Sequence, residues 1–156
     1  MKPLSRYGIL VFAACLLLIS CQKTITLKSG TVKLTFRNMV DTNAMLLDSD
    51  VYTNPFGETY TITKFKYYIS NVSLGMSGST SKAIEKDSYH LVDQSQPGSL
   101  SVSFDIEENT FSTLHFLLGV DSIRNVSGAQ TGALDPLNDM FWTWNSGYIM
   151  AKMEGT

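Results

Sequence analysis

The most regular signal along this chain is an alternation of apolar and polar residues. Val32, Leu34 and Phe36 alternate with polar neighbours, which is the period of a half-buried strand. Residues 100–106 repeat the pattern, and residues 111–120 form the most apolar run, for which we predict a central strand. No stretch keeps a 3.6-residue period, so strands and not helices are expected.

The stretch 60–76 is long, rich in β-forming residues and changes phase once. A change of phase within one strand predicts a β-bulge or a bend. The alternating apolar positions before and after the change are Phe65, Tyr67 and Ile69, then Val72, Leu74 and Met76.

Polar loop-forming segments separate the strand patterns. Residues 41–55 are loop-rich, and residues 121–139 are filled with Gly, Asn, Asp and Ser. Residues 89–93 and 141–153 have strand-like aromatic content. Several short strands with turns between them predict an all-β fold, an antiparallel β-sandwich with long irregular loops.

The N-terminus differs in composition from the rest of the chain. Lys2 and Arg6 precede an uncharged apolar run at 7–19, which is typical of a secretory signal peptide. The run ends at Cys21 after Leu-Ile-Ser, a sequence that resembles the bacterial lipobox, in which the cysteine is acylated. The alternative is an apolar N-terminal anchor that happens to contain cysteines.

These signals divide the chain into a lipoprotein signal peptide at 1–20, a tether at 21–30 and a β-sandwich domain at 31–156. The β-pattern breaks off near the last residue, and we expect the domain to be incomplete at its C-terminus. The predicted location is the cell envelope, lipid-anchored in the periplasm or at the outer membrane.

Charge and cysteine content narrow the function classes. Cleavage after residue 20 removes two of the 12 basic residues and none of the 14 acidic ones, so the net charge changes from −2 to −4. With no basic stripe, a nucleic-acid partner is not expected. Because Cys15 leaves with the signal and Cys21 is acylated, the mature domain has no free thiol for zinc or catalysis.

Catalytic motifs are absent from the sequence, and we expect no enzyme activity. The two histidines, His90 and His115, both lie in predicted strands, where a packed or surface role competes with metal binding. Asp121, Asn125 and Asp135 fall in the polar segment. They predict a loop held by side-chain hydrogen bonds. The alternative is a calcium site formed by Asp135 and Asp139, with Asp121, Asn125 and Asn138 nearby.

Trp142 and Trp144 are two residues apart in a predicted strand. Side chains at that spacing point to the same face. The pair is therefore either part of a large aromatic core or a redox-capable aromatic patch.

The chain resembles the MbnP-like copper-binding domain family from about Thr31 to its last residue. The matching segments are LGVDS at 118–122, NVSGAQTGALDP at 125–136, MFWTWNSGY at 140–148, FKYYISNVSL at 65–74 and YHLVD at 89–93. Members often carry a histidine at the end of the first strand, where this chain has Asn38.

The resemblance implies an extracytoplasmic β-domain with a copper site made from histidines and, in some members, a tryptophan oxidised to kynurenine. A di-haem, peroxidase-like partner performs that oxidation. By resemblance, the candidate copper residues are His90, His115, Trp142 and Trp144. Imidazole suits Cu(II), and the thioethers of six methionines after the first residue suit Cu(I).

Two functions follow from these observations. The first is a lipoprotein that binds or hands over copper without turnover. The alternative is a metal-free β-sandwich module that binds a glycan or a protein partner at the outer membrane.

Overall fold

A computed structural model describes residues 28–80, 82–142 and 147–156 of the protein. Trp144 and Cys21 lie outside these residues. Within the described ranges, no helix is long and apolar enough to cross a membrane.

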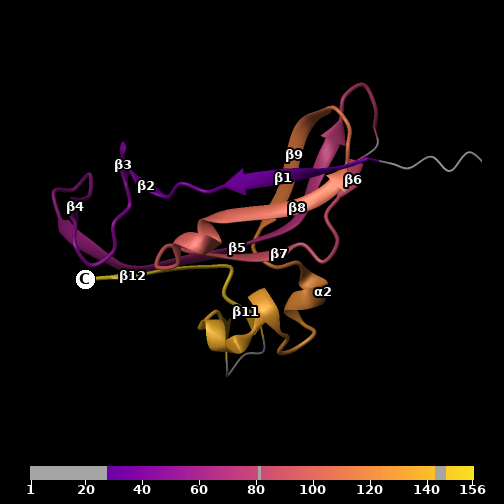
Figure 1. The fold of residues 1–156 in the computed structure, drawn as a ribbon. Helices are drawn as coiled ribbons and strands as arrows, with labels where there is room; N and C mark the ends of the chain where they lie inside the picture. Colours follow the sequence, from indigo (N-terminus) through magenta and orange to yellow (C-terminus); the bar gives the residue numbers. More distant parts are fainter. Residues whose placement is uncertain (1–27, 81, 143–146) are drawn as a thin grey trace, which may run out of the picture.

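Antiparallel strands account for most of the described chain, which confirms the all-β sandwich (Figure 1). The strands are β1 (Ser29–Thr35), β2 (Met39–Val40), β3 (Asn43–Ala44), β4 (Val51–Thr53), β5 (Thr59–Met76), β6 (Lys82–Ile84), β7 (Tyr89–Asp93), β8 (Ser101–Glu107), β9 (Phe111–Leu118), β10 (Phe141–Trp142), β11 (Gly147–Tyr148) and β12 (Ala151–Gly155). The helical turns are η1 (Pro97–Leu100), α2 (Ser122–Asn125), η2 (Gly132–Leu134) and η3 (Pro136–Asn138).

Strand β5 is the centre of the larger sheet. It pairs with β4, β6, β7, β9 and β12, all antiparallel. Ile69 pairs with His90 of β7 and also with Leu118 of β9. Strands β7 and β9 therefore lie at opposite edges of β5.

The phase change predicted within β5 is a β-bulge. The register with β9 shifts between Ser70 and Ser73, and Asn71 has a left-handed φ of 55°. Because the bulge inserts one residue, Val72 returns to the same core as Tyr67 and Ile69 and is fully buried.

The two faces of the larger sheet are covered differently (Figure 1). On the inner face, β1 and β8 form a two-stranded sheet over a core that contains Ile69 and Val72. On the outer face, the irregular segment after β9 packs over Tyr68. Five buried residues form this outer core: Tyr68, Val120, Leu134, Met140 and Tyr148.

The prediction that residues 111–120 form a central strand is wrong. In the described chain β9 pairs with β5 alone, and Leu114, Phe116 and Leu118 are 42%, 49% and 59% exposed. Leu114 and Leu118 pair with the core residues Leu74 and Ile69, so their side chains point toward the inner face. The β1–β8 sheet does not bury them. The prediction of a central strand rested on the apolar content of this segment, which does not determine where a strand lies in a sheet.

Smaller differences concern the ends of elements. Strand β1 begins at Ser29, within the stretch assigned to the tether, and the loop-rich residues 41–55 contain β3 and β4. Strands β3 and β4 are exposed or half-buried. Strands without a buried face show little hydrophobic alternation, which is why the pattern did not reveal their bounds.

Candidate functional site

Asp121 connects the irregular segment to the larger sheet. Its carboxylate accepts hydrogen bonds from the Tyr89 hydroxyl and, at 3.3 Å, from the Asn71 side-chain amide. The same carboxylate caps α2 by accepting the Arg124 backbone N–H at 3.0 Å. Hydrogen bonds, first of all the one from Tyr89, hold the pKa of Asp121 below its ordinary value.

Asn125 and Asp135 have similar roles further along the segment. The Asn125 side-chain oxygen accepts the Tyr148 backbone N–H at 2.7 Å. Asp135 accepts the Leu137 backbone N–H at 2.9 Å and so caps η3. These bonds, together with burial of Leu134, keep a sequence without periodicity in one conformation.

Arg124 projects from α2 over the ring of Tyr89. Its Cζ lies 5.5 Å from the ring centroid, a distance typical of a cation–π contact. One guanidinium nitrogen donates to the Gln130 side-chain oxygen at 2.9 Å, and another lies 3.4 Å from the Asp87 carboxylate.

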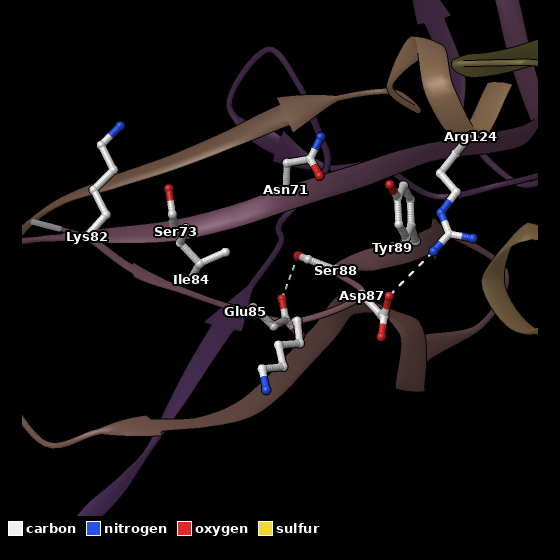
Figure 2. Close-up of a pocket in the computed structure, with 10 residues that line it drawn as sticks. Asn71, Ser73, Lys82, Ile84, Glu85, Asp87, Ser88, Tyr89 and Arg124 are labelled. Atoms are coloured by element: carbon white, nitrogen blue, oxygen red, sulfur yellow. Dashed lines mark hydrogen bonds and ion pairs between the residues drawn. The ribbon is translucent and has the colours of Figure 1, made fainter. Parts of the chain in front are cut away.

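An open cleft of about 700 Å³ lies between β5, the β6–β7 turn and Arg124. We call it the Arg124 cleft. Figure 2 shows Arg124 reaching toward Asp87 beside the ring of Tyr89. The lining residues are Asn71, Ser73, Lys82, Ile84, Glu85, Lys86, Asp87, Ser88, Tyr89 and Arg124.

His90 lies at the edge of the larger sheet and contacts Glu85. Its Nε2 is 3.0 and 2.9 Å from the two oxygens of that carboxylate, and Glu85 also accepts the Ser88 hydroxyl at 2.6 Å. In many metal sites, the histidine ligand binds the metal through one ring nitrogen and donates a hydrogen bond from the other to a carboxylate. Glu85 is placed to be that carboxylate for His90.

His115 lies on the opposite face from His90. It pairs with Ser73, which lies between the core residues Val72 and Leu74 and so faces the other way. His90, in contrast, pairs with the core residue Ile69. Directly paired residues share a face of the sheet, so the two imidazoles point to opposite faces and are not brought together.

Trp142 ends β10 and is 39% exposed, so it is not part of a buried aromatic core. Its neighbour Phe141 packs on Tyr148 with ring centroids 5.0 Å apart. The described residues contain no group of three His, Cys, Asp or Glu side chains arranged for a metal ion.

Sequence reasoning missed the residues that form the Arg124 cleft. Tyr89, Glu85 and Arg124 come from three segments, and although Tyr89 begins the matching segment YHLVD, no spacing or motif connects it with Glu85 or Arg124. One signal could have located the bulge that forms a wall of the cleft. Asn71, a residue that favours left-handed backbone, lies where the hydrophobic pattern of β5 changes phase.

A cluster of charges surrounds Asp139, a residue that the sequence suggested only as a possible calcium ligand. Asp139, which has a left-handed φ of 63°, contacts Lys64 at 2.7 Å and Lys152 at 2.9 Å. The hydrogen bonds from Lys64 and then Lys152 lower the pKa of Asp139 to about 2. This cluster attaches the end of the irregular segment to β5 and β12.

Comparison with known proteins identifies the family. A sequence model described as MbnP matches residues 29–156. The solved structure of MbnP from Methylosinus trichosporium matches with a TM-score of 0.61 and 14% identity, over 82% of this chain and 55% of that one. The chain thus spans about half the length of that relative, and no curated protein sequence matches it. Since the family match covers most of the chain, the protein belongs to the MbnP family.

Proposed function

We propose that this MbnP-family protein is an extracytoplasmic, lipid-anchored domain that binds copper without catalysing a reaction. The observation that carries the proposal is the family match over residues 29–156. The signal-like N-terminus ending at Cys21 supports the location. A di-haem, peroxidase-like protein that oxidises a tryptophan is the partner proposed for it.

The described geometry limits how copper can be held. His90 and His115 face opposite sides of the larger sheet, so only one of them can serve a given ion. His90 is the better candidate, because Glu85 holds its Nε2 and leaves Nδ1 as the other donor atom. Trp142 and Trp144 remain candidates for oxidation to kynurenine.

Copper titration of the full chain tests this proposal. We expect stoichiometric binding that is lost in His90→Ala and retained in His115→Ala. Glu85→Gln should weaken binding by about 10- to 100-fold, because it removes the carboxylate behind the imidazole. Intact-mass analysis after co-expression with a di-haem partner would detect oxidised tryptophan. Loss of binding in both histidine variants would contradict the described separation, and no binding in the wild type would refute copper binding.

A second experiment tests the membrane anchor. We expect cells fed a labelled fatty acid to incorporate the label at Cys21 and to hold the protein in the membrane fraction. Cys21→Ala should remove both, since the thiol is the acylated group. Cys15→Ala is the matched control and should leave both unchanged. A Cys21→Ala protein that kept its label would rule out this anchor.

A metal-free binding module is the second candidate function. The open Arg124 cleft favours it, because several charged and hydrogen-bonding side chains line it and could contact a small polar ligand.

A further inference from the structure

We infer that the Arg124 cleft binds an acidic sugar unit, with Arg124 holding its carboxylate and the β5 side chains contacting its hydroxyl groups. The inference requires no copper, so it stands or fails separately from the copper proposal. It gives the metal-free candidate function a defined site and a ligand class.

Position is the first argument. Tyr89 and Arg124 line the main cleft of about 700 Å³ and also two smaller adjoining cavities of about 440 and 310 Å³. Small-ligand sites are commonly about 300–1,000 Å³ in volume. A ligand in any of these three cavities would therefore lie beside Tyr89 and Arg124.

Charge is the second argument. The main cleft carries three cations, Lys82, Lys86 and Arg124, against two acids. A third acid, Asp121, lines the adjoining cavity, where its carboxylate is engaged by Tyr89 and Asn71. Glu85 is engaged by His90 and Ser88, whereas Asp87 is held only at 3.4 Å and its side chain is 86% exposed. The chain as a whole has a net charge of −2. A local positive excess on an acidic protein favours an anionic ligand.

Arg124 is oriented before any ligand arrives. Gln130 accepts from its guanidinium at 2.9 Å and donates to its backbone carbonyl at 3.0 Å, while the ring of Tyr89 supports its face. A planar guanidinium held in this way recognises a carboxylate through two parallel hydrogen bonds. An incoming carboxylate can replace the long, exposed contact with Asp87.

Backbone conformation is the third argument. Asn71 and Asp87 both line the cleft and both have left-handed φ values, 55° and 49°. Asn and Asp adopt this conformation more readily than other non-glycine residues, and here it belongs to the bulge in β5 and to the turn between β6 and β7 that form two walls of the cleft. The bulge at Asn71 places its side chain near that of Ser73 on the outer face. Amide and hydroxyl groups beside a carboxylate-binding arginine match a hydroxyl-rich acidic ligand.

Titration calorimetry with an oligomer of galacturonic acid tests the inference, with a neutral galactose oligomer of equal length as the reference ligand. We expect saturable binding of the acidic oligomer that weakens with salt and little binding of the neutral one. Arg124→Gln should weaken binding at least about tenfold, as loss of a charge-assisted hydrogen bond does, and Arg124→Lys should restore only part of it.

One control and one second cleft variant keep the test decisive. Lys33→Gln removes an exposed cation of β1, outside the cleft, and should bind as the wild type does. Lys86→Gln removes a cleft cation and should weaken binding even if Arg124→Gln unfolds the loop. Equal binding of both oligomers, no effect of either cleft variant, or competition by inorganic phosphate at equal affinity would each overturn the assignment to an acidic sugar.

Discussion

Asp93→Ala is expected to lower the free energy of unfolding by about 3 kcal/mol, as removal of one member of a buried ion pair does. Asp93 lies 3.0 Å from the Lys66 ammonium, and the two side chains are 10% and 15% exposed. The substitution would leave the largely buried side chain of Lys66 without its counter-charge. It also removes the acceptor for the Ser95 backbone N–H and hydroxyl, at 2.9 and 2.7 Å.

Urea unfolding of the two proteins measures this difference. The matched control is Asp105→Ala, which removes an exposed strand carboxylate bonded to the Thr31 hydroxyl at 2.7 Å. It should cost less than about 1 kcal/mol. Asp93→Asn separates the two contributions, because it keeps an acceptor for Ser95 but not the charge. Equal midpoints for Asp93→Ala and Asp105→Ala would contradict the buried pair.

The Asp93 interaction also predicts a dependence on pH. Burial raises the pKa of Asp93, but hydrogen bonds from Ser95 and Lys66 outweigh it, and the net pKa lies below 3.8. A carboxylate with a lowered folded-state pKa adds stability above its unfolded pKa, and the contribution is lost as pH falls through the folded value. The difference between wild type and Asp93→Asn should therefore shrink below about pH 4.

Asp121→Ala is expected to have the second-largest effect, a loss of about 2 kcal/mol. It removes the cap of α2 and leaves the Tyr89 hydroxyl without its acceptor. Loss of an N-cap costs about 0.5–2 kcal/mol, and loss of the hydrogen bond from the half-buried Tyr89 adds to it.

Thermal unfolding and limited proteolysis together measure the Asp121 effect. Asp121→Ala should lower the melting temperature and expose the segment 121–139 to cleavage. Asp121→Asn keeps an acceptor oxygen and should be milder. Asp135→Ala removes a cap further from the sheet and serves as the matched control. An unchanged melting temperature for Asp121→Ala would show that packing alone holds the segment.

The elements that the sequence predicted correctly are those determined by the order of apolar and polar residues within a single segment. The alternation at 100–106 predicted β8, and the phase change within 60–76 predicted the bulge at Asn71. In both cases the side chains that face the core must recur every second residue, and an inserted residue must shift them by one. The family was also evident from sequence, because its motifs at 118–148 are contiguous.

The site residues show the limit of local reasoning. The two histidines are ordinary strand positions in sequence, and only the bulge between Ile69 and Ser73 places them on opposite faces of the sheet. Arg124 lies in a polar segment without periodicity, and its contact with Tyr89 forms beside the hydrogen bond between Asp121 and that tyrosine. The sequence around either residue does not predict such a contact.

By itself, then, the sequence determined the strands with a buried face, the signal-like N-terminus and the MbnP family. The tertiary structure decided that β5 and not β9 is the central strand, because position in a sheet depends on which strands pair and not on apolar content. It also decided which polar side chains share the Arg124 cleft. Pairing and packing join residues distant in the chain, and their free energy depends on the whole arrangement, which no single segment contains.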